Sequence, residues 1–214
     1  EDLFLSVSGR KAAEADKAGR TDKKMKQIIF ATGNAGKMKE IREILNGTGW
    51  NVLSLKDAGI DAEIEENGTT FEENAKIKAE GIRNWCLENG IPGCSGISAK
   101  EIIVLADDSG LEIDWLGGEP GIYSARYMGH ETSYREKNAN LISRLDGVPK
   151  EKRTARFVCA IAAALPDGNS LVTRGTIEGY IGWEECGSNG FGYDPSFYLY
   201  DNDISTAELS AEEK

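Results

Sequence analysis

Residues 102–126, which read IIVLADDSGLEIDWLGGEPGIYSAR, decide how the rest of the chain is interpreted. An apolar run ends at two adjacent carboxylates, Asp107 and Asp108, and Ser109-Gly110 then predicts a turn before a second alternating segment and a Gly/Pro-rich loop. Carboxylates at the end of a buried strand suit a divalent metal held over a polyphosphate, but a polar hairpin turn between two core strands explains the same pattern. Adjacent strand residues point to opposite faces, so one ion can reach both carboxylates only if the backbone bends at Ser109-Gly110. We expect that bend, with Asp108 facing a cleft.

The length and composition fit one domain or one two-lobed unit. With 214 residues, 40% of them hydrophobic, the chain is well clear of the disordered class. A formal net charge of −11 argues against a protein that binds nucleic acid through a basic surface. It leaves a small phosphorylated substrate open, since a few lysines and a bridging cation suffice. No apolar run is long enough for a membrane helix, and the N-terminal LFLSV is too short for a secretory signal, so we expect a cytoplasmic protein with no membrane partner.

The cysteines and the single histidine exclude several kinds of catalytic site. Cys86, Cys94, Cys159 and Cys186 have no CxxC spacing, which predicts reduced, mostly buried thiols rather than a zinc or thioredoxin-type site. His130 is the only histidine and lies in the polar stretch MGHETSYRE, which favours an exposed loop position. Catalytic chemistry must therefore depend on carboxylates, lysines and a metal.

The two ends of the chain differ from its body. Residues 1–24 have mixed charges and no persistent apolar face, and Met25 resembles a natural start, so we interpret 1–24 as a flexible leader and 25–214 as the domain. At the other end, the capping box that starts at Ser210 is followed by only one turn before Lys214. Because one turn does not recover the cost of helix nucleation, we expect the natural protein to continue, which makes the domain C-terminally truncated.

A short strand at residues 27–31 is predicted to lead through a glycine-containing loop into a helix with Met38, Ile41, Ile44 and Leu45 on its apolar face. This geometry places free N–H groups and one cation around an anion. A plain strand-to-helix turn capped by Asn34 is the alternative. The loop differs from the Walker pattern, and its residues are Thr32, Gly33, Asn34, Ala35, Gly36 and Lys37.

A second strand (residues 50–55), an acidic loop (61–68) and a helix follow. The acidic loop is either a solvated surface loop or a second source of carboxylates for a metal. Thr70 and Glu73 form a capping box that opens the helix. Asn74 and Lys78 stand four residues apart, so they are expected to reach one cleft together. The apolar stripe of this helix consists of Ala75, Ala79, Ile82 and Cys86.

The C-terminal part of the sequence predicts a helix, a hairpin and an aromatic loop. Ser133 and Glu136 form a capping box, and Tyr134, Leu141, Ile142 and Leu145 are assigned to the buried side of that helix. Residues 155–165 and 170–181 are predicted to pair as an antiparallel hairpin around a Pro-Asp-Gly turn. In SNGFGYDP, two glycines flank Phe191, which leaves its ring either open to a flat ligand or buried in a turn.

Four motifs together resemble the noncanonical purine nucleoside triphosphate pyrophosphatases, the inosine/xanthosine triphosphate pyrophosphatase family. They are TGNAGK, FEENAKIKA, ADDSGLEIDWLGGEPGIYSARY and GFGYDPSF, in that order, and the resemblance extends from about Ile28 to Lys214. The resemblance implies an α/β fold with a long twisted mixed sheet flanked by helices and two lobes enclosing a central cleft. It also implies a homodimer that requires Mg²⁺ to hydrolyse ITP, dITP or XTP to the monophosphate and pyrophosphate.

The same resemblance assigns roles to individual residues. Residues 32–37 would cradle the triphosphate, with Lys37 as the cation and Lys78 adding charge stabilisation. Glu65 and Asp108 would hold Mg²⁺, and the base is left open between Asp108, which is favoured, and Asp107. On the substrate side, Ser109 would contact the substrate and Phe191 would stack on the base. The remaining members of the implied substrate-binding set are Gly192, Tyr193, Asp194 and Lys214.

The sequence departs from the family pattern at its C-terminal end, and two other functions remain open. Family members continue past the position of Lys214 with a Ser-His-Arg segment expected to read the purine 6-oxygen, so this chain is expected to discriminate bases less well and to be less active. A related pyrophosphatase acting on modified or pyrimidine nucleotides would share the cleft and the metal. A nucleotide-binding module without turnover would share the cleft alone.

Overall fold

The computed structural model describes residues 26–94, 96–210 and 213, and its centre is one mixed sheet. The strand order is β2-β1-β3-β4-β5-β6. β1 pairs in parallel with β2 and β3, while the pairs from β3 to β6 are antiparallel. The predicted α/β class is therefore confirmed. The strands are β1 (Lys26–Ala31), β2 (Trp50–Ser54), β3 (Ile103–Ile113), β4 (Thr154–Ala164), β5 (Ser170–Ile181) and β6 (Phe197–Tyr198).

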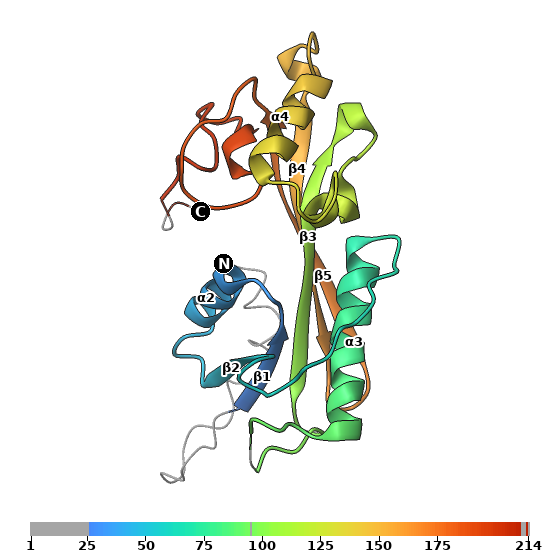
Figure 1. Ribbon diagram of the computed structural model, residues 1–214. Coiled ribbons are helices and arrows are strands. Elements are labelled where there is room, and N and C mark those ends of the chain that lie inside the picture. Colours follow the sequence, from blue (N-terminus) through green and yellow to red (C-terminus); the bar gives the residue numbers. More distant parts are fainter. Residues whose placement is uncertain (1–25, 95, 211–212, 214) are drawn as a thin grey trace.

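The long strands β3, β4 and β5 connect two groups of elements (Figure 1). One group contains β1, β2 and the helices α2 (Ala35–Ile44) and α3 (Phe71–Asn89). The other contains α4 (Tyr134–Arg144), β6 and the C-terminal segment. Short 3-10 helices complete the described elements: η1 (Asp114–Leu116), η2 (Gly121–Arg126), η3 (Lys150–Lys152) and η4 (Asp194–Ser196).

The predicted turn at Ser109-Gly110 is wrong, because β3 runs straight through both residues. Its register with β4 is unbroken from Val104 opposite Ala164 to Ile113 opposite Ala155. A continuous antiparallel partner keeps Gly110 extended, so the glycine serves a close approach instead of a turn. A Cβ at Gly110 would lie 2.5 Å from Oγ of Ser124.

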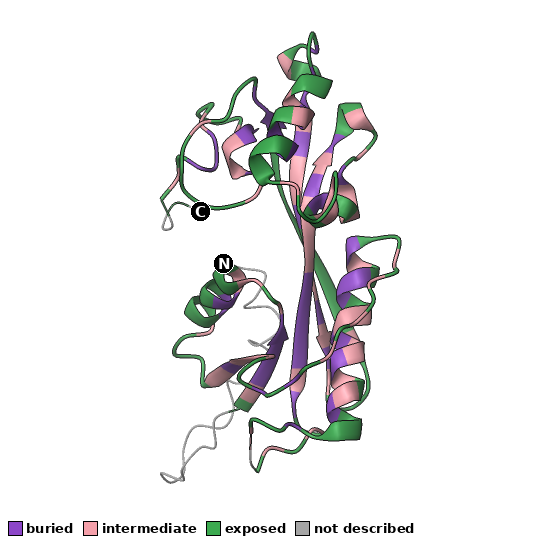
Figure 2. Ribbon diagram, viewed as in Figure 1, coloured by how far each residue is buried: buried purple, intermediate pink, exposed green. Residues whose placement is uncertain are grey.

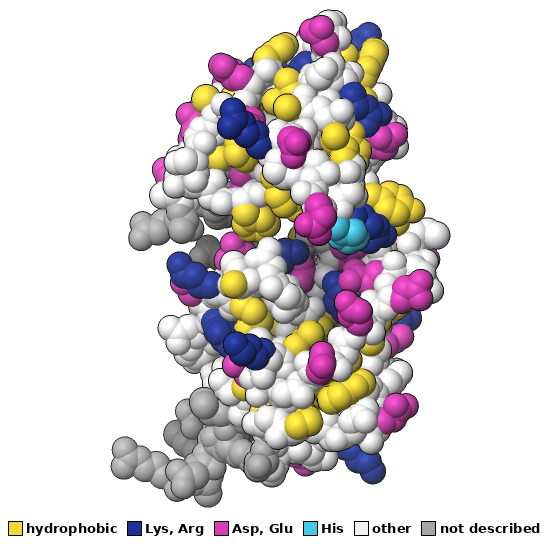
Figure 3. Space-filling view, in the orientation of Figure 1, with side chains coloured by type: hydrophobic (Ala, Val, Ile, Leu, Met, Phe, Trp, Pro, Cys, Tyr) yellow, Lys and Arg dark blue, Asp and Glu magenta, His cyan; other side chains and the backbone are white. Residues whose placement is uncertain are grey.

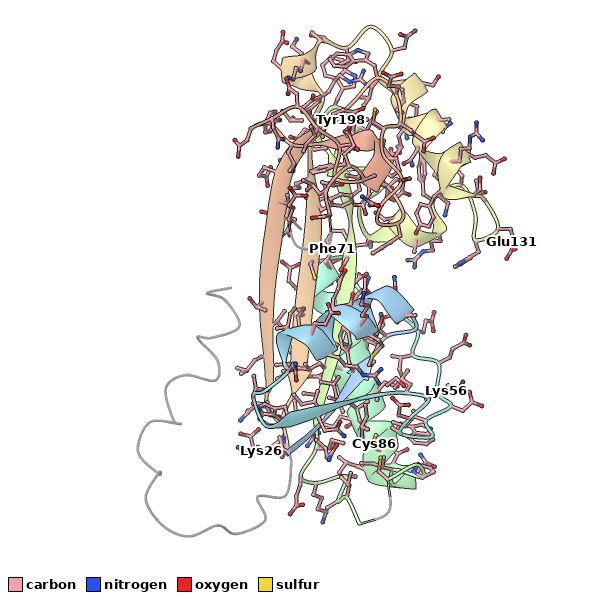
Figure 4. The ribbon with its side chains drawn as sticks, turned by 90° about the vertical axis from the view of Figure 1, so that its left-hand side faces the viewer. Lys26, Lys56, Phe71, Cys86, Glu131 and Tyr198 are labelled. Atoms are coloured by element: carbon pink, nitrogen blue, oxygen red, sulfur yellow. The ribbon has the colours of Figure 1, made fainter. Side chains whose placement is uncertain are left out.

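The first group is held together by α3 packing on the sheet. The predicted stripe of α3 is confirmed as fully buried and packs in one cluster with alanines of β3 and β4. Small side chains on both sides allow the helix to lie close to the strands. Figure 2 shows the buried side of α3 turned toward the sheet, and Figure 4 shows α3 running from Phe71, between the two groups, to Cys86 at the far end.

Most predicted elements are confirmed, including the hairpin of β4 and β5 and the capping box of Ser133 and Glu136. Three details are wrong. Ile44 and Tyr134 were assigned to buried faces but are 55% and 40% exposed. The Thr70–Glu73 box is only half formed, because the Glu73 carboxylate accepts from the N–H and hydroxyl of Thr69 instead of the Thr70 N–H.

The four thiols are free, as predicted, but only Cys86 is buried, so the expectation of mostly buried thiols is wrong. Burial raises the pKa of the Cys86 thiol to about 11. His130 is exposed, which confirms the loop position predicted for it.

Two predictions fall outside the described residues: the leader at 1–24 and the role of Lys214. Among the helices that the structure describes, none has the length and apolar character needed to cross a membrane.

Candidate active site

Asp107 and Asp108 lie on opposite faces of β3, as strand alternation requires in the absence of a bend. Asp107 is 4% exposed and forms an ion pair with Lys37 from the first turn of α2. The Ser109 hydroxyl, on the same face, donates to the Asp107 carboxylate at 3.2 Å. The expectation that a bend would aim both carboxylates at one ion is therefore wrong.

The loop at residues 32–37 connects β1 to α2 and ends in a side-chain cap. Oδ1 of Asn34 accepts hydrogen bonds from the N–H groups of Gly36, at 2.8 Å, and Lys37, at 3.3 Å. The Asn34 N–H in turn donates to Oγ1 of Thr32 at 3.2 Å. An anion that uses the first N–H groups of α2 must therefore displace the Asn34 side chain, while Lys37 is already oriented toward β3.

Asp108 faces α3, where its surroundings differ from those of Asp107. Nδ2 of Asn74 donates to Oδ2 of Asp108 at 3.0 Å. Burial raises the pKa of Asp108, helped by repulsion from Glu66, while the Asn74 amide, Lys78 and the Ser109 N–H oppose that rise. A carboxyl whose pKa lies above its ordinary value is suited to accept a proton near neutral pH.

Lys78 links the acidic loop to the open edge of β3. Its ammonium pairs with Glu66 at 2.9 Å and donates to the carbonyl oxygen of Asp107 at 3.1 Å. This edge is open because the pairing of β1 with β3 ends at Ala106 within the described chain. Asn74 and Lys78 thus both contact β3 at its two aspartates, Asn74 at the Asp108 carboxylate and Lys78 at the Asp107 carbonyl.

The acidic loop presents Glu66 to Asp108, whereas Glu65 is exposed. Burial alternates along residues 61–68, with every even-numbered residue partly buried and every odd-numbered one exposed. Ile64 packs against Gly81 of α3, so Glu66, two residues later, returns to the same side. The family resemblance assigns Glu65 to the metal, and that assignment stays a prediction; the apolar Ala62 and Ile64 at even positions are the sequence signal that Glu66 turns toward α3.

A divalent cation fits these residues through carboxylate oxygens rather than through a closed cage. Among the described residues there is no group of three or more His, Cys, Asp or Glu side chains arranged to hold a metal. Mg²⁺ needs only one or two carboxylates when substrate phosphates and waters complete its coordination. The repulsion between Asp108 and Glu66 is the kind of excess negative charge that a bound cation would relieve.

The aromatic loop brings Phe191 to the start of α2. Phe191 is 53% exposed, and its ring lies 4.0 Å from the position that a Cβ on Gly36 would take. The Asp194 carboxylate accepts from the Phe191 N–H at 2.9 Å and from the Thr206 hydroxyl at 2.9 Å, which fixes the loop. Side chains of both charges gather at the level between the two groups of elements (Figure 3).

Gly192 and Tyr193 connect the aromatic loop to the rest of the protein through hydrogen bonds. Gly192 has a φ of +67°, and its carbonyl accepts from Nδ2 of Asn138 at 3.2 Å. Tyr193 is buried, and its hydroxyl donates to the carbonyl of Ser124 at 2.7 Å. The Ser124 hydroxyl accepts from the N–H of Leu111, so this serine, which sequence reasoning missed, joins the loop to β3.

The fold and these motifs match one family of proteins. Residues 28–214 match the model of the Ham1 family. This chain belongs to the Ham1 family. Relatives of this Ham1 chain named "dITP/XTP pyrophosphatase" include one from Bacillus licheniformis, 48% identical over 89% of this chain and 90% of the relative. Another, from Bacillus subtilis, is 46% identical over 89% of each chain.

Solved structures agree with this assignment. The Staphylococcus aureus Ham1 protein superposes with a TM-score of 0.75 and 38% identity, covering 88% of this chain and 89% of that one. A Ham1 protein from Coxiella burnetii gives a TM-score of 0.74 and 34% identity with the same coverage. The mixed sheet and its helices are therefore those of the Ham1 fold.

A surface cavity of about 470 Å³ lies elsewhere, between the end of α2 and β2, and is lined in part by Arg42, Trp50 and Val52. Neither Asp107 nor Asp108 lines it. In this Ham1 chain the candidate site follows from the side-chain geometry around Asp107 and Asp108, and that cavity has no part in it.

Proposed function

We propose that this protein hydrolyses nucleoside triphosphates to the monophosphate and pyrophosphate, with dITP, ITP and XTP as substrates. The main support for the proposal is that the two aspartates have different partners on the two faces of β3. Asp107 pairs with Lys37 of the loop at 32–37, whereas Asp108 faces Asn74 and Glu66. The names of the relatives from both Bacillus species support the reaction and two of the substrates, dITP and XTP.

The triphosphate would lie against the loop at residues 32–37, over the first turn of α2. Helix N-termini favour anions, and Lys37 adds a positive charge whose direction Asp107 sets. Ser109, which donates to Asp107 on the same face of β3, would contact the same phosphates. This arrangement supplies phosphate binding without a Walker loop.

The base would lie beside the same loop, where the exposed ring of Phe191 approaches Gly36. An exposed aromatic face stacks on a flat heterocycle, and Gly36 leaves room beside it. Asp194 acts on the base indirectly, because both of its carboxylate oxygens hold the loop itself. Tyr193 is buried, so its part is also to support Phe191. A central cleft between the two groups of elements, lined by these residues, is part of the proposal.

Asp108 would act as the base that takes a proton from the attacking water. In the metal-free protein, burial and the nearby Glu66 raise its pKa. A bound Mg²⁺ would lower that pKa again, so the role of Asp108 as the base rests on its position beside Asn74 and the acidic loop. Mg²⁺, held by Asp108 with Glu66 or Glu65, would neutralise phosphate charge and stabilise the pyrophosphate leaving group. Lys78 lies between Glu66 and the Asp107 carbonyl and would keep the acidic loop against β3.

We also propose that the protein forms a homodimer. Residues 170–179 of β5 pair only with β4 in the described chain, and the apolar side chains Leu171, Val172 and Ile177 on that strand are 41–52% exposed. A second copy would cover them. Light scattering coupled to gel filtration should give twice the mass of the 23.3 kDa chain; a monomer at micromolar concentration would remove this part.

One assay with Mg²⁺ and ITP, dITP, XTP, dTTP and ATP tests the main proposal and its alternatives. Pyrophosphate release from the purine analogues, with ¹⁸O from labelled water in the monophosphate, is the expected result. Preferred release from dTTP would indicate the pyrimidine pyrophosphatase. Binding without release would indicate a module without turnover, and release of single phosphate would overturn the reaction type.

A further inference from the structure

Asn74 is a buried polar residue in the first turn of α3 with a defined partner on each side of its amide. It is 1% exposed. Oδ1 accepts from the Gly68 N–H at 2.8 Å, and Nδ2 donates to Oδ2 of Asp108 at 3.0 Å. Because a backbone N–H only donates and an ionised carboxylate only accepts, the amide has one satisfactory orientation.

The loop can approach this amide only because residue 68 is a glycine. A Cβ there would lie 2.8 Å from Oδ1 of Asn74 and 2.7 Å from Cβ of Glu73. Two residues earlier, Glu66 pairs with Lys78 at 2.9 Å. The acidic loop is thus attached to α3 at two points, and one of them is the amide that also holds Asp108.

We propose that Asn74 is a positioning residue that fixes the Asp108 carboxylate and the acidic loop in a single arrangement. The inference rests on the proposed function, since it assigns to Asn74 the relative placement of the proposed base and of the loop carboxylates. A side chain joined to both cannot turn toward one without losing the other. Removing the amide therefore releases the Asp108 carboxylate and, at once, one of the contacts that hold the acidic loop to α3.

Asn74→Asp separates the hydrogen bond to the acidic loop from the hydrogen bond to Asp108. The new carboxylate still accepts from the Gly68 N–H, but it cannot donate to Asp108 and repels it. The expected result is a fall in kcat/KM of about 10–100-fold and a rise of similar size in the Mg²⁺ concentration for half-maximal rate. Asn89→Asp makes the same substitution at the exposed end of α3 and should change neither value. Asn74→Ala should also lower kcat/KM.

A double exchange gives a readout independent of activity. Asn74→Asp combined with Asp108→Asn restores an amide-to-carboxylate hydrogen bond with reversed polarity. Measured without Mg²⁺, the melting temperature should fall in Asn74→Asp, and Asp108→Asn should raise it by more in that background than in the wild type. Turnover of the double variant should stay lowered by about 10²–10⁴-fold, because the proposed base is gone.

Two results would overturn the inference: wild-type kcat/KM and Mg²⁺ dependence in Asn74→Asp, or an Asp108→Asn change in melting temperature that is the same with Asn74 and with Asp at position 74. Failure of the proposed function shows differently, as a wild-type protein that releases no pyrophosphate. In that case the melting temperatures still decide whether Asn74 and Asp108 are coupled.

Discussion

Asp107 and Asp108 are neighbours in the chain, yet the two faces of β3 give them different surroundings. Asp107 has a cationic partner, Lys37, brought from α2. Asp108 has an amide donor, Asn74, and a repelling carboxylate, Glu66, brought from α3 and the acidic loop. In the proposed mechanism, one unbroken strand therefore supplies a cation-paired carboxylate for substrate binding on one face and the base on the other.

The largest effect is expected from Asp108→Asn, which removes the proposed base and preserves shape. Loss of a general base lowers rates by about 10²–10⁴-fold. The change should appear in kcat for ITP, measured as pyrophosphate release at saturating Mg²⁺. A variant that kept wild-type kcat would take Asp108 out of the catalytic role.

A smaller, different effect is expected from Asp107→Asn. Lys37 loses the carboxylate that orients it, and hydrogen bonds to charged groups contribute about 1.5–3 kcal/mol. Because tenfold corresponds to about 1.4 kcal/mol, kcat/KM should fall by roughly 10–100-fold, mainly through KM. Steady-state kinetics with varied ITP check this. A loss confined to kcat would mean that Asp107, like Asp108, acts in the chemical step, and would contradict the different roles proposed for the two faces of β3.

Removing the hydroxyl that supports the aromatic loop should have a moderate effect on stability. In Tyr193→Phe the buried carbonyl of Ser124 loses its donor, which costs about 1–2 kcal/mol of unfolding free energy. Urea denaturation measures the change. Tyr123→Phe, at a position that is 56% exposed, is the control and should leave stability unchanged.

The smallest effect concerns pH and the stability of the metal-free protein. The pKa of Asp108 is raised in the folded state, chiefly by burial. The folded state therefore holds this proton more tightly than the unfolded state, so the stabilisation present at low pH is lost as pH rises through the raised pKa. In EDTA, Asp108→Asn should gain stability over the wild type as pH rises from about 4 to 7. Parallel pH profiles for the two proteins would contradict the assignment.

The elements were predictable where local patterns determine them. The 3.6-residue stripe of α3, the Ser133 cap and the turn at 166–168 each depend on neighbouring residues, and each prediction is confirmed. Gly110 was misread because a glycine after a serine signals a turn unless a partner strand holds it extended, and the partner, β4, lies about 50 residues away in the chain.

The site was predictable in its residue types but not in its pairings. Lys37, Asp107, Asp108, Asn74 and Lys78 were all named from the sequence, yet which carboxylate meets which cation depends on the face that each occupies. Side chains alternate between the two faces of β3, so the face of each residue can be deduced only once the strand is known to be unbroken. Ser124 and Tyr193 act through tertiary contacts, which no local pattern in the sequence shows.

The most direct test of the account is where a metal binds when substrate is present. Crystals grown with Mn²⁺ and a non-hydrolysable ITP analogue would show the ion by anomalous scattering. We expect an ion bound to Asp108 and the acidic loop, with Asp107 still paired with Lys37. An ion bridging Asp107 and Asp108, with Lys37 released, would contradict it.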